Sequence, residues 1–194
     1  MKGVKAVAME IKSVSDDGIF NGYLSVFGEE DHYGDVVEKG AFQKTLKVDK
    51  GQGVARRPLL WQHDTWQPVG ILSGKEDDNG LLVQGHINVE VQRGREAVSL
   101  LKQRAITGLS QGFVPVKWAP RGTNQAGRLL QEIDLWEGSL ATFPALPSAQ
   151  VLALRSTLPP WLQEDPEPKD SPAIAEAARI ASETLIRLTR PLAA

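Results

Sequence analysis

The sequence contains no cysteine among its 194 residues. This absence excludes disulfide bonds, thiol nucleophiles, CxxC redox motifs and zinc sites with thiolate ligands, and it is typical of a reducing compartment. Long apolar runs are absent too: Glu10 and Lys12 interrupt the first residues, and no segment reaches the roughly 18 apolar residues that span a bilayer. We therefore expect a soluble intracellular protein with no membrane segment.

An excess of one charge sign is also absent, since 22 basic residues face 24 acidic ones and the formal net charge is −2. A dedicated binder of nucleic acid or of a membrane surface would concentrate positive charge, so we expect neither role. The remaining composition, with 41% hydrophobic and 24% charged residues, is ordinary for a globular protein. The length fits one domain with a tail.

Short β-type runs separated by turn residues dominate the chain up to residue 154. They predict an opening hairpin over residues 5–27, three strands between residues 58 and 89, and two further strands over residues 106–118 and 128–142. Apolar residues at three- and four-residue spacing predict a helix over residues 91–105, and residues 41–46 fit a short amphipathic helix. The predicted fold class is mainly β with peripheral helices, of the α+β type.

The composition changes after residue 154. Residues 158–172 are rich in proline, glutamate and aspartate, which predicts a linker. Ser171 and Pro172 are typical of a helix start, and one apolar stripe follows them: Ile174, Ala178, Ala181, Leu185 and Leu188. A helix that packs on its own domain and a helix that docks on a partner both fit this stripe. We predict a domain over residues 1–154 and a Pro-rich linker with an amphipathic helical tail over residues 155–194.

Only three histidines are present, His32, His63 and His86. His86 lies inside a predicted strand, and His32 lies in an acidic turn-like segment, so a structural or solvated role is the default for both. His63 follows the apolar run PLLW at the point where a buried strand emerges into a loop, a position typical of functional residues. A metal-dependent hydrolase is an alternative that would need all three histidines to converge.

Two further residues carry chemistry. Ser110 has glycines at positions 108 and 112, which let another backbone or a substrate approach closely. Glu137 shares a strand face with Ile133 and Leu135, and a carboxylate on an apolar face needs a partner, either an imidazole N–H or an arginine in a structural ion pair. Together with His63, these residues have the types of a nucleophile, a base and an orienting acid in acyl transfer.

Six segments, in this order, resemble the tailed-bacteriophage (caudovirus) prohead maturation proteases, which are similar in fold to the herpesvirus assemblins. They extend over about residues 8–154 and read GYLSVF, GDVVEKGAF, LLWQHD with PVG, NGLLVQGHI, AITGLSQGF and LWEGSLATFPALPSAQV. The resemblance implies an antiparallel β-barrel of the herpesvirus-protease type. It also implies a serine endopeptidase that uses neither a cofactor nor a metal ion.

The same resemblance assigns site residues. The catalytic histidine and serine of the family fall on His63 and Ser110. The herpesvirus enzymes use a second histidine as the third member, but no histidine follows His86 here, so we take Glu137 as the orienter and Asp134 as the runner-up. The oxyanion donors are not assigned by the resemblance, and loop glycines such as the one at position 138 are candidates.

The implied substrates are the scaffolding region of the major capsid protein, the scaffold and the protease itself, inside the immature phage procapsid in the host cytoplasm. The herpesvirus enzymes work as dimers, so a homodimer is expected by analogy. Residues 155–194 would recruit the protease into the procapsid or be cut away on activation. The alternative is a non-catalytic procapsid scaffold or interaction module with the same fold.

Overall fold

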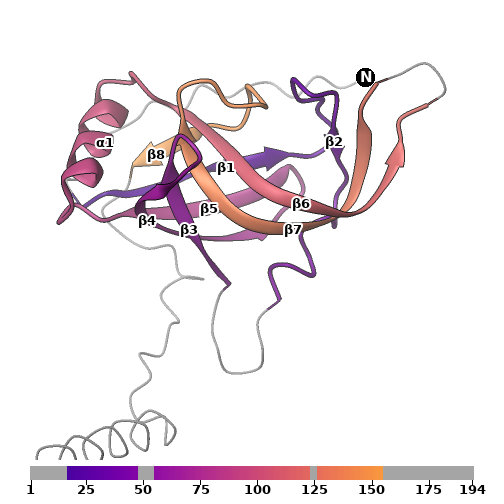
Figure 1. Cartoon of the computed structure of the whole chain (residues 1–194), viewed down its shortest axis with the longest axis horizontal. Helices are drawn as coiled ribbons and strands as arrows, with labels where there is room; N and C mark the ends of the chain where they lie inside the picture. Colours follow the sequence, from indigo (N-terminus) through magenta and orange to yellow (C-terminus); the bar gives the residue numbers. More distant parts are fainter. Residues whose placement is uncertain (1–16, 48–54, 123–125, 155–194) are drawn as a thin grey trace, which may run out of the picture. The chain divides into compact units, whose positions relative to one another are not determined.

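The computed structural model describes residues 17–47, 55–122 and 126–154 (Figure 1). Their elements, in chain order, are β1 (Ile19–Val26), β2 (Val36–Val37), β3 (Arg56–Trp61), β4 (Asp64–Glu76), β5 (Gly80–Ile87), α1 (Gln92–Lys102), β6 (Gly108–Pro120), β7 (Arg128–Ala141) and β8 (Val151–Leu154). The mainly β class is confirmed. The first arm of the opening hairpin and the tail helix lie outside the described residues, as does the predicted linker.

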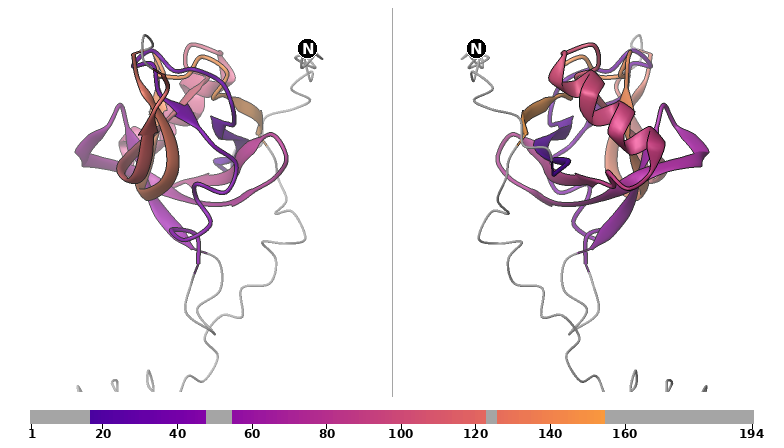
Figure 2. Two further views of the ribbon diagram at one scale, coloured as in Figure 1. Left: turned by 90° about the vertical axis from the view of Figure 1, so that its right-hand side faces the viewer. Right: turned by 90° about the vertical axis from the view of Figure 1, so that its left-hand side faces the viewer.

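The described residues contain one helix. It lies within the predicted range and buries Gly94, Ala97, Val98 and Leu101. It lies at one end of the strands (Figure 1) and faces the viewer in the right-hand view of Figure 2. This helix is not long and apolar enough to cross a membrane.

The second predicted helix, over residues 41–46, is wrong. These residues form turns, and they pair with β7 instead of continuing as a helix. The backbone N–H of Ile133 donates to the carbonyl of Ala41 at 2.9 Å, and the N–H of Leu135 donates to the Thr45 hydroxyl at 3.0 Å. The apolar residue Phe42 is fully buried in this turn, so its burial, rather than a helical period, explains the hydrophobic pattern.

All strands belong to one sheet with the order β2-β7-β3-β4-β5-β1-β8, and β6 pairs with β7. Most neighbours are antiparallel, as predicted, but β2 and β3 both run parallel to β7. Between β6 and β8 there is an isolated bridge, Gly108 with Gln150, and a hydrogen bond from the Leu109 N–H to the Ala149 carbonyl at 2.8 Å. Because this is not a continuous strand ladder, a closed barrel stays a prediction.

The β6–β7 pairing has two parts. The pairing is regular from Gly108, which lies opposite Ala141, to Gly112, which lies opposite Glu137. Beyond Gly112 the register shifts several times. Such shifts insert extra residues and bend the strands. The site described below lies in the regular part.

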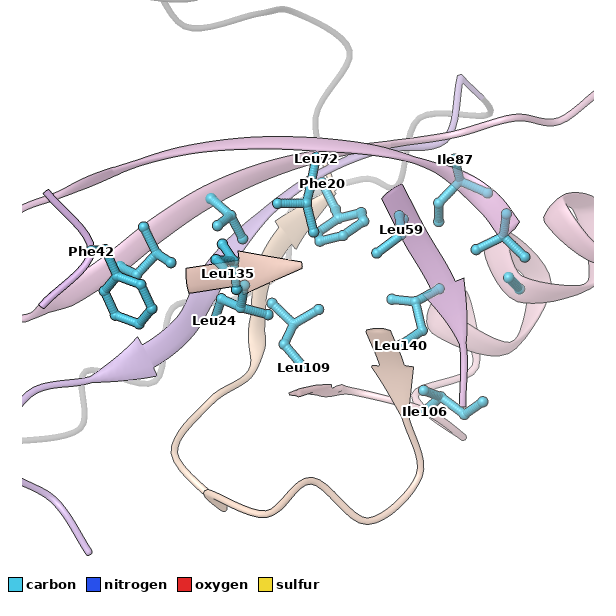
Figure 3. Close-up of a cluster of buried hydrophobic side chains, with 14 of the residues drawn as sticks. Phe20, Leu24, Phe42, Leu59, Leu72, Ile87, Ile106, Leu109, Leu135 and Leu140 are labelled. Carbon is cyan, nitrogen blue, oxygen red and sulfur yellow. The ribbon is translucent and has the colours of Figure 1, made fainter. Parts of the chain in front are cut away.

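The hydrophobic core lies on the inward side of the strands. Its fully buried side chains come from several strands and from the turn at Phe42 (Figure 3); those on β1, β3, β6 and β7 include Phe20, Leu24, Leu59, Leu109, Leu135 and Leu140. Burying a side chain of this size stabilises the fold by about 1.5–3 kcal/mol. Leu109 and Leu140 directly adjoin Ser110 and Ser139, so core packing fixes the two strands that carry the site.

Candidate active site

His63 lies in the tight turn between β3 and β4. Trp61 pairs with Asp64, and the two residues between them both have positive φ, 53° at Gln62 and 61° at His63. This is the pattern of a type I′ hairpin turn, which usually contains Asn-Gly. Left-handed backbone costs about 1–2 kcal/mol for a residue with a Cβ. The turn is therefore strained and depends on the contacts around it.

The side chain of Gln62 supplies two of these contacts. Its Nε2 donates to the Thr142 hydroxyl at 2.7 Å, and the Thr142 N–H donates back to Oε1 at 3.2 Å. The Gln62 N–H also donates to the Leu140 carbonyl at 3.0 Å. From the other side, the Arg93 guanidinium of α1 lies 5.5 Å from the ring centre of Trp61. The turn is thus held by both the end of β7 and the helix.

The imidazole of His63 contacts Glu137. Nδ1 lies 2.7 Å from Oε1, and the Glu137 side chain is 11% exposed against 45% for His63. As predicted, Glu137 is buried on the same face of β7 as Ile133 and Leu135. An ionised carboxylate only accepts hydrogen bonds, so this contact is a hydrogen bond in the tautomer that has its proton on Nδ1. In that tautomer the lone pair of a neutral ring is on Nε2, and His63 lines the pocket described below.

Ser139 completes this arrangement, and the sequence analysis missed it. Its hydroxyl donates to Glu137 Oε2 at 2.7 Å and accepts from the His63 backbone N–H at 3.1 Å. The residue is fully buried. Strand alternation, which puts position 139 on the same face as Glu137, was the signal that could have found it.

Ser110 is paired with Ser139 across the β6–β7 ladder and is 7% exposed. It lines the same pocket as His63, which has a volume of about 450 Å3. Within the described ranges, no hydrogen bond joins the Ser110 hydroxyl to the His63 ring. Catalytic hydrogen bonds are often long in free enzymes and shorten when substrate binds.

The loop between β1 and β2 forms another part of the pocket wall, through Asp31, His32, Tyr33 and Asp35. An ion pair attaches this loop to β7: the Arg128 Nε and backbone N–H each donate to Asp35 Oδ1 at 3.0 Å. Asp35 is 5% exposed, and its hydrogen bond raises the pKa of Arg128 above its ordinary value. Within the loop, Asp31 Oδ1 accepts from the N–H of Tyr33 at 2.8 Å. Further lining comes from the segment after β7, namely Phe143, Ala145, Leu146 and Ala149.

The glycines near Ser110 are needed for close packing of the protein itself. A Cβ at Gly112 would lie 2.2 Å from Glu137 Oε1, and one at Gly108 would lie 2.5 Å from the Ala141 carbonyl oxygen. Gly138, expected in a loop as a candidate oxyanion donor, instead lies inside β7. A Cβ there would lie 2.3 Å from a methyl carbon of Leu72, so packing explains this glycine.

The other candidates take no part in the His63–Glu137 contact. Asp134 is exposed and accepts hydrogen bonds from Trp136 Nε1 at 2.9 Å and from the Thr45 hydroxyl at 3.3 Å. His32 lines the pocket, whereas His86 is exposed on β5. Among residues 17–47, 55–122 and 126–154, no group of three or more histidine, aspartate or glutamate side chains is placed to hold a metal ion. The three histidines thus do not form the metal site that the hydrolase alternative requires.

Comparisons with known proteins agree with the resemblance. The model of the family described as caudovirus prohead serine protease matches residues 6–163. The prohead protease of Enterobacteria phage HK97 is 31% identical over 186 residues, which cover 89% of this chain and 80% of that protein. The crystal structure of KSHV protease with a hexapeptide phosphonate inhibitor aligns with a TM-score of 0.48 at 12% identity, over 85% of this chain and 76% of that one. The family match and the HK97 relative together show that this chain belongs to the caudovirus prohead serine protease family.

Proposed function

We propose that this protein is a serine endopeptidase that cleaves the scaffolding region of its phage's major capsid protein, the scaffold and itself. It acts inside the immature procapsid in the host cytoplasm. Family membership supports the capsid-maturation role. The observation that carries the chemistry is the 2.7 Å contact between His63 Nδ1 and Glu137 Oε1, beside a pocket that Ser110 also lines.

In the proposed mechanism, Ser110 is the nucleophile and His63 is the general base. The Ser110 oxygen bonds to a substrate peptide carbonyl carbon while Nε2 of His63 takes the hydroxyl proton. Glu137 holds the proton on Nδ1 and stabilises the imidazolium that forms. The imidazolium then gives its proton to the leaving amine, which leaves an acyl-enzyme that water hydrolyses by the same route.

The placement of Ser110 favours a substrate that enters the pocket. Ser110 is only 7% exposed and lines a pocket to which the β1–β2 loop and the segment after β7 also contribute. Leu24, Leu109 and Phe113 line this pocket beside Asp31 and His32, so it offers both apolar and polar contacts to a peptide. A peptide chain in extended form would fit such a site better than a folded surface would.

The test is to co-express the chain with its phage's major capsid protein and compare wild type with Ser110→Ala by intact mass. If the capsid protein loses an N-terminal piece with the wild-type protein and not with Ser110→Ala, the result supports the protease and locates the cut. Ser25→Ala is the matched control, because Ser25 is also a buried strand serine but its hydroxyl has no hydrogen-bond partner among the residues that the structure describes. Identical uncleaved masses with all three, in assembled proheads, would favour the non-catalytic scaffold.

Two further parts of the proposal rest on the resemblance alone. They are a homodimer and a role of residues 155–194 in recruitment or activation. Sedimentation of the purified protein tests the first, and a monomer at micromolar concentration would contradict it. The mass of the protease recovered from mature virions tests the second, since retention of the whole tail would contradict its removal.

A further inference from the structure

Ser139 connects the parts of the proposed site in a closed ring of hydrogen bonds. Its hydroxyl donates to Glu137 Oε2 at 2.7 Å, the other oxygen, Oε1, lies 2.7 Å from His63 Nδ1, and the backbone N–H of His63 donates back to the Ser139 hydroxyl at 3.1 Å. One hydroxyl therefore contacts both the acid and the main chain of the base. Within the described residues, no other side chain does so.

The position of Ser139 in the sheet adds to this role. Across β7, it pairs on one side with Leu60, three residues before His63, and on the other side with Ser110. It is fully buried, with 0% exposure. The hydroxyl is therefore held on a rigid central strand between the elements that carry the base and the nucleophile.

We propose that Ser139 is a positioning residue, whose hydroxyl fixes the Glu137 carboxylate and the strained His63 backbone so that the imidazole proton stays on Nδ1. This inference rests on the proposed function. A carboxylate with one donor can rotate about its last bond, whereas donors on both oxygens fix its plane. The bond to the His63 N–H also helps to hold a left-handed residue that would otherwise relax.

Removal of the hydroxyl has a definite physical consequence. In Ser139→Ala, Glu137 Oε2 and the His63 N–H both lose this partner, and the loss is most unfavourable for the Glu137 carboxylate, which is only 11% exposed. The carboxylate and the turn then adjust to find other partners. The hydrogen bond that sets the tautomer of His63 is no longer enforced, and the proton distributes between Nδ1 and Nε2.

The first measurement does not need catalysis. In full-length Ser110→Ala protein, 15N NMR of the imidazole reports the tautomer of neutral His63. We expect a single form with the proton on Nδ1, and a mixture once Ser139→Ala is added. Ser25→Ala in the same background should keep the single form. An unchanged Nδ1–H tautomer in the Ser110→Ala/Ser139→Ala protein would overturn the proposal.

The second measurement uses the active enzyme. Ser139→Ala should lower kcat by about 100-fold, as expected for a misplaced base, and leave KM nearly unchanged. Ser139→Cys keeps a weaker donor of similar size, so it should fall between wild type and Ser139→Ala in both tautomer ratio and kcat. It also serves as the test if Ser139→Ala does not fold. Equal kcat values for wild type and Ser139→Ala would contradict a positioning role.

The two experiments separate the inference from the proposed function. If wild type fails to cleave capsid protein but the tautomer changes as described, the positioning role stands and the proteolytic function fails. If wild type cleaves and Ser139→Ala changes neither tautomer nor kcat, the function stands and the positioning role fails.

Discussion

Gly112 on β6 leaves the space that the Glu137 carboxylate on β7 occupies. The two residues are directly paired, and a Cβ at position 112 would lie 2.2 Å from Oε1 and 2.8 Å from Cδ of Glu137. No real Cβ is accommodated at such distances without movement. Since β6 also carries Ser110, the strand of the proposed nucleophile determines where the acid can point.

Gly112→Ala should therefore displace the Glu137 carboxylate from His63. We expect kcat/KM to fall by about 100-fold, as for a misplaced catalytic group, and stability to fall by about 1–3 kcal/mol through overpacking. Adding Glu137→Asp, which shortens the side chain, should recover part of the stability but not the activity. Capsid-protein cleavage rates and denaturant unfolding check both parts. A fully active Gly112→Ala enzyme would show that this close contact does not position the acid.

The choice of third member is tested by a matched pair of amide substitutions. Glu137→Gln should lower kcat by about 10^4-fold, because an amide can favour the wrong tautomer of His63. Asp134→Asn should change kcat by no more than about twofold, as for a surface substitution, since its carboxylate contacts Thr45 and Trp136 instead. Cleavage rates of the two variants at equal folded concentration decide between them, and the reverse order of effects would make Asp134 the orienter.

The strained turn is tested at Gln62. Gln62→Ala loses the contacts with Thr142 and keeps a Cβ in left-handed backbone, whereas Gln62→Gly loses the same contacts but relieves the strain. We expect the glycine variant to be more stable than the alanine variant by about 1 kcal/mol. Urea unfolding of the two proteins measures the difference. Equal stabilities would mean that the turn changes its conformation once the Gln62 side chain is removed.

Removing either member of the Asp35–Arg128 ion pair should destabilise the protein, but by different amounts. Arg128→Ala leaves the 5% exposed Asp35 carboxylate without its side-chain partner, and breaking a buried pair in this way costs about 3–5 kcal/mol. Asp35→Ala leaves an arginine that is 38% exposed, which water can solvate, so its effect should be smaller. Thermal unfolding of both variants checks the order, and a larger loss for Asp35→Ala would contradict it.

Stability at alkaline pH should depend on Tyr23. Burial, together with the hydrogen bond from its hydroxyl to Asp77 Oδ2 at 2.7 Å, raises the pKa of Tyr23 above its ordinary value of 10.0. A pKa raised by folding gives stability that is fully present below pH 10 and is lost as the pH rises through the folded-state pKa. Tyr23→Phe should therefore lose less stability than wild type as the pH is raised from below 10 through the folded-state pKa of Tyr23. Urea unfolding across this range is the measurement, and parallel curves would argue against the assignment.

Local patterns in the sequence predicted most of the elements correctly. Alternation identified the buried face of β7 and placed Glu137 on it, and the three-to-four spacing identified α1. The three strands predicted between residues 58 and 89 correspond to β3, β4 and β5. These signals are local, since each depends on residues within one element or one turn.

The parts that failed depend on contacts between distant segments. Nothing in the sequence of β3 indicates that it runs parallel to β7, and this pairing is what brings His63 to Glu137. The turn at Gln62 and His63 does not contain the glycine that usually indicates such a turn. Contacts with the end of β7 and with α1 hold its left-handed backbone instead. Gly138 was expected in a loop but lies in β7. The close approach of Leu72 from another strand, which the sequence does not reveal, explains the glycine.

The register shifts between β6 and β7 all lie on the side of Gly112 away from Ser110. They lie between Gly112 and Phe113, between Pro115 and Lys117, and between Lys117 and Trp118, and so between the site and the far end of the hairpin. At each shift, one strand contains an extra residue relative to its partner. The pairing of Ser110 with Ser139 is thus separated from the connection after Pro120 by three places where the ladder is already irregular.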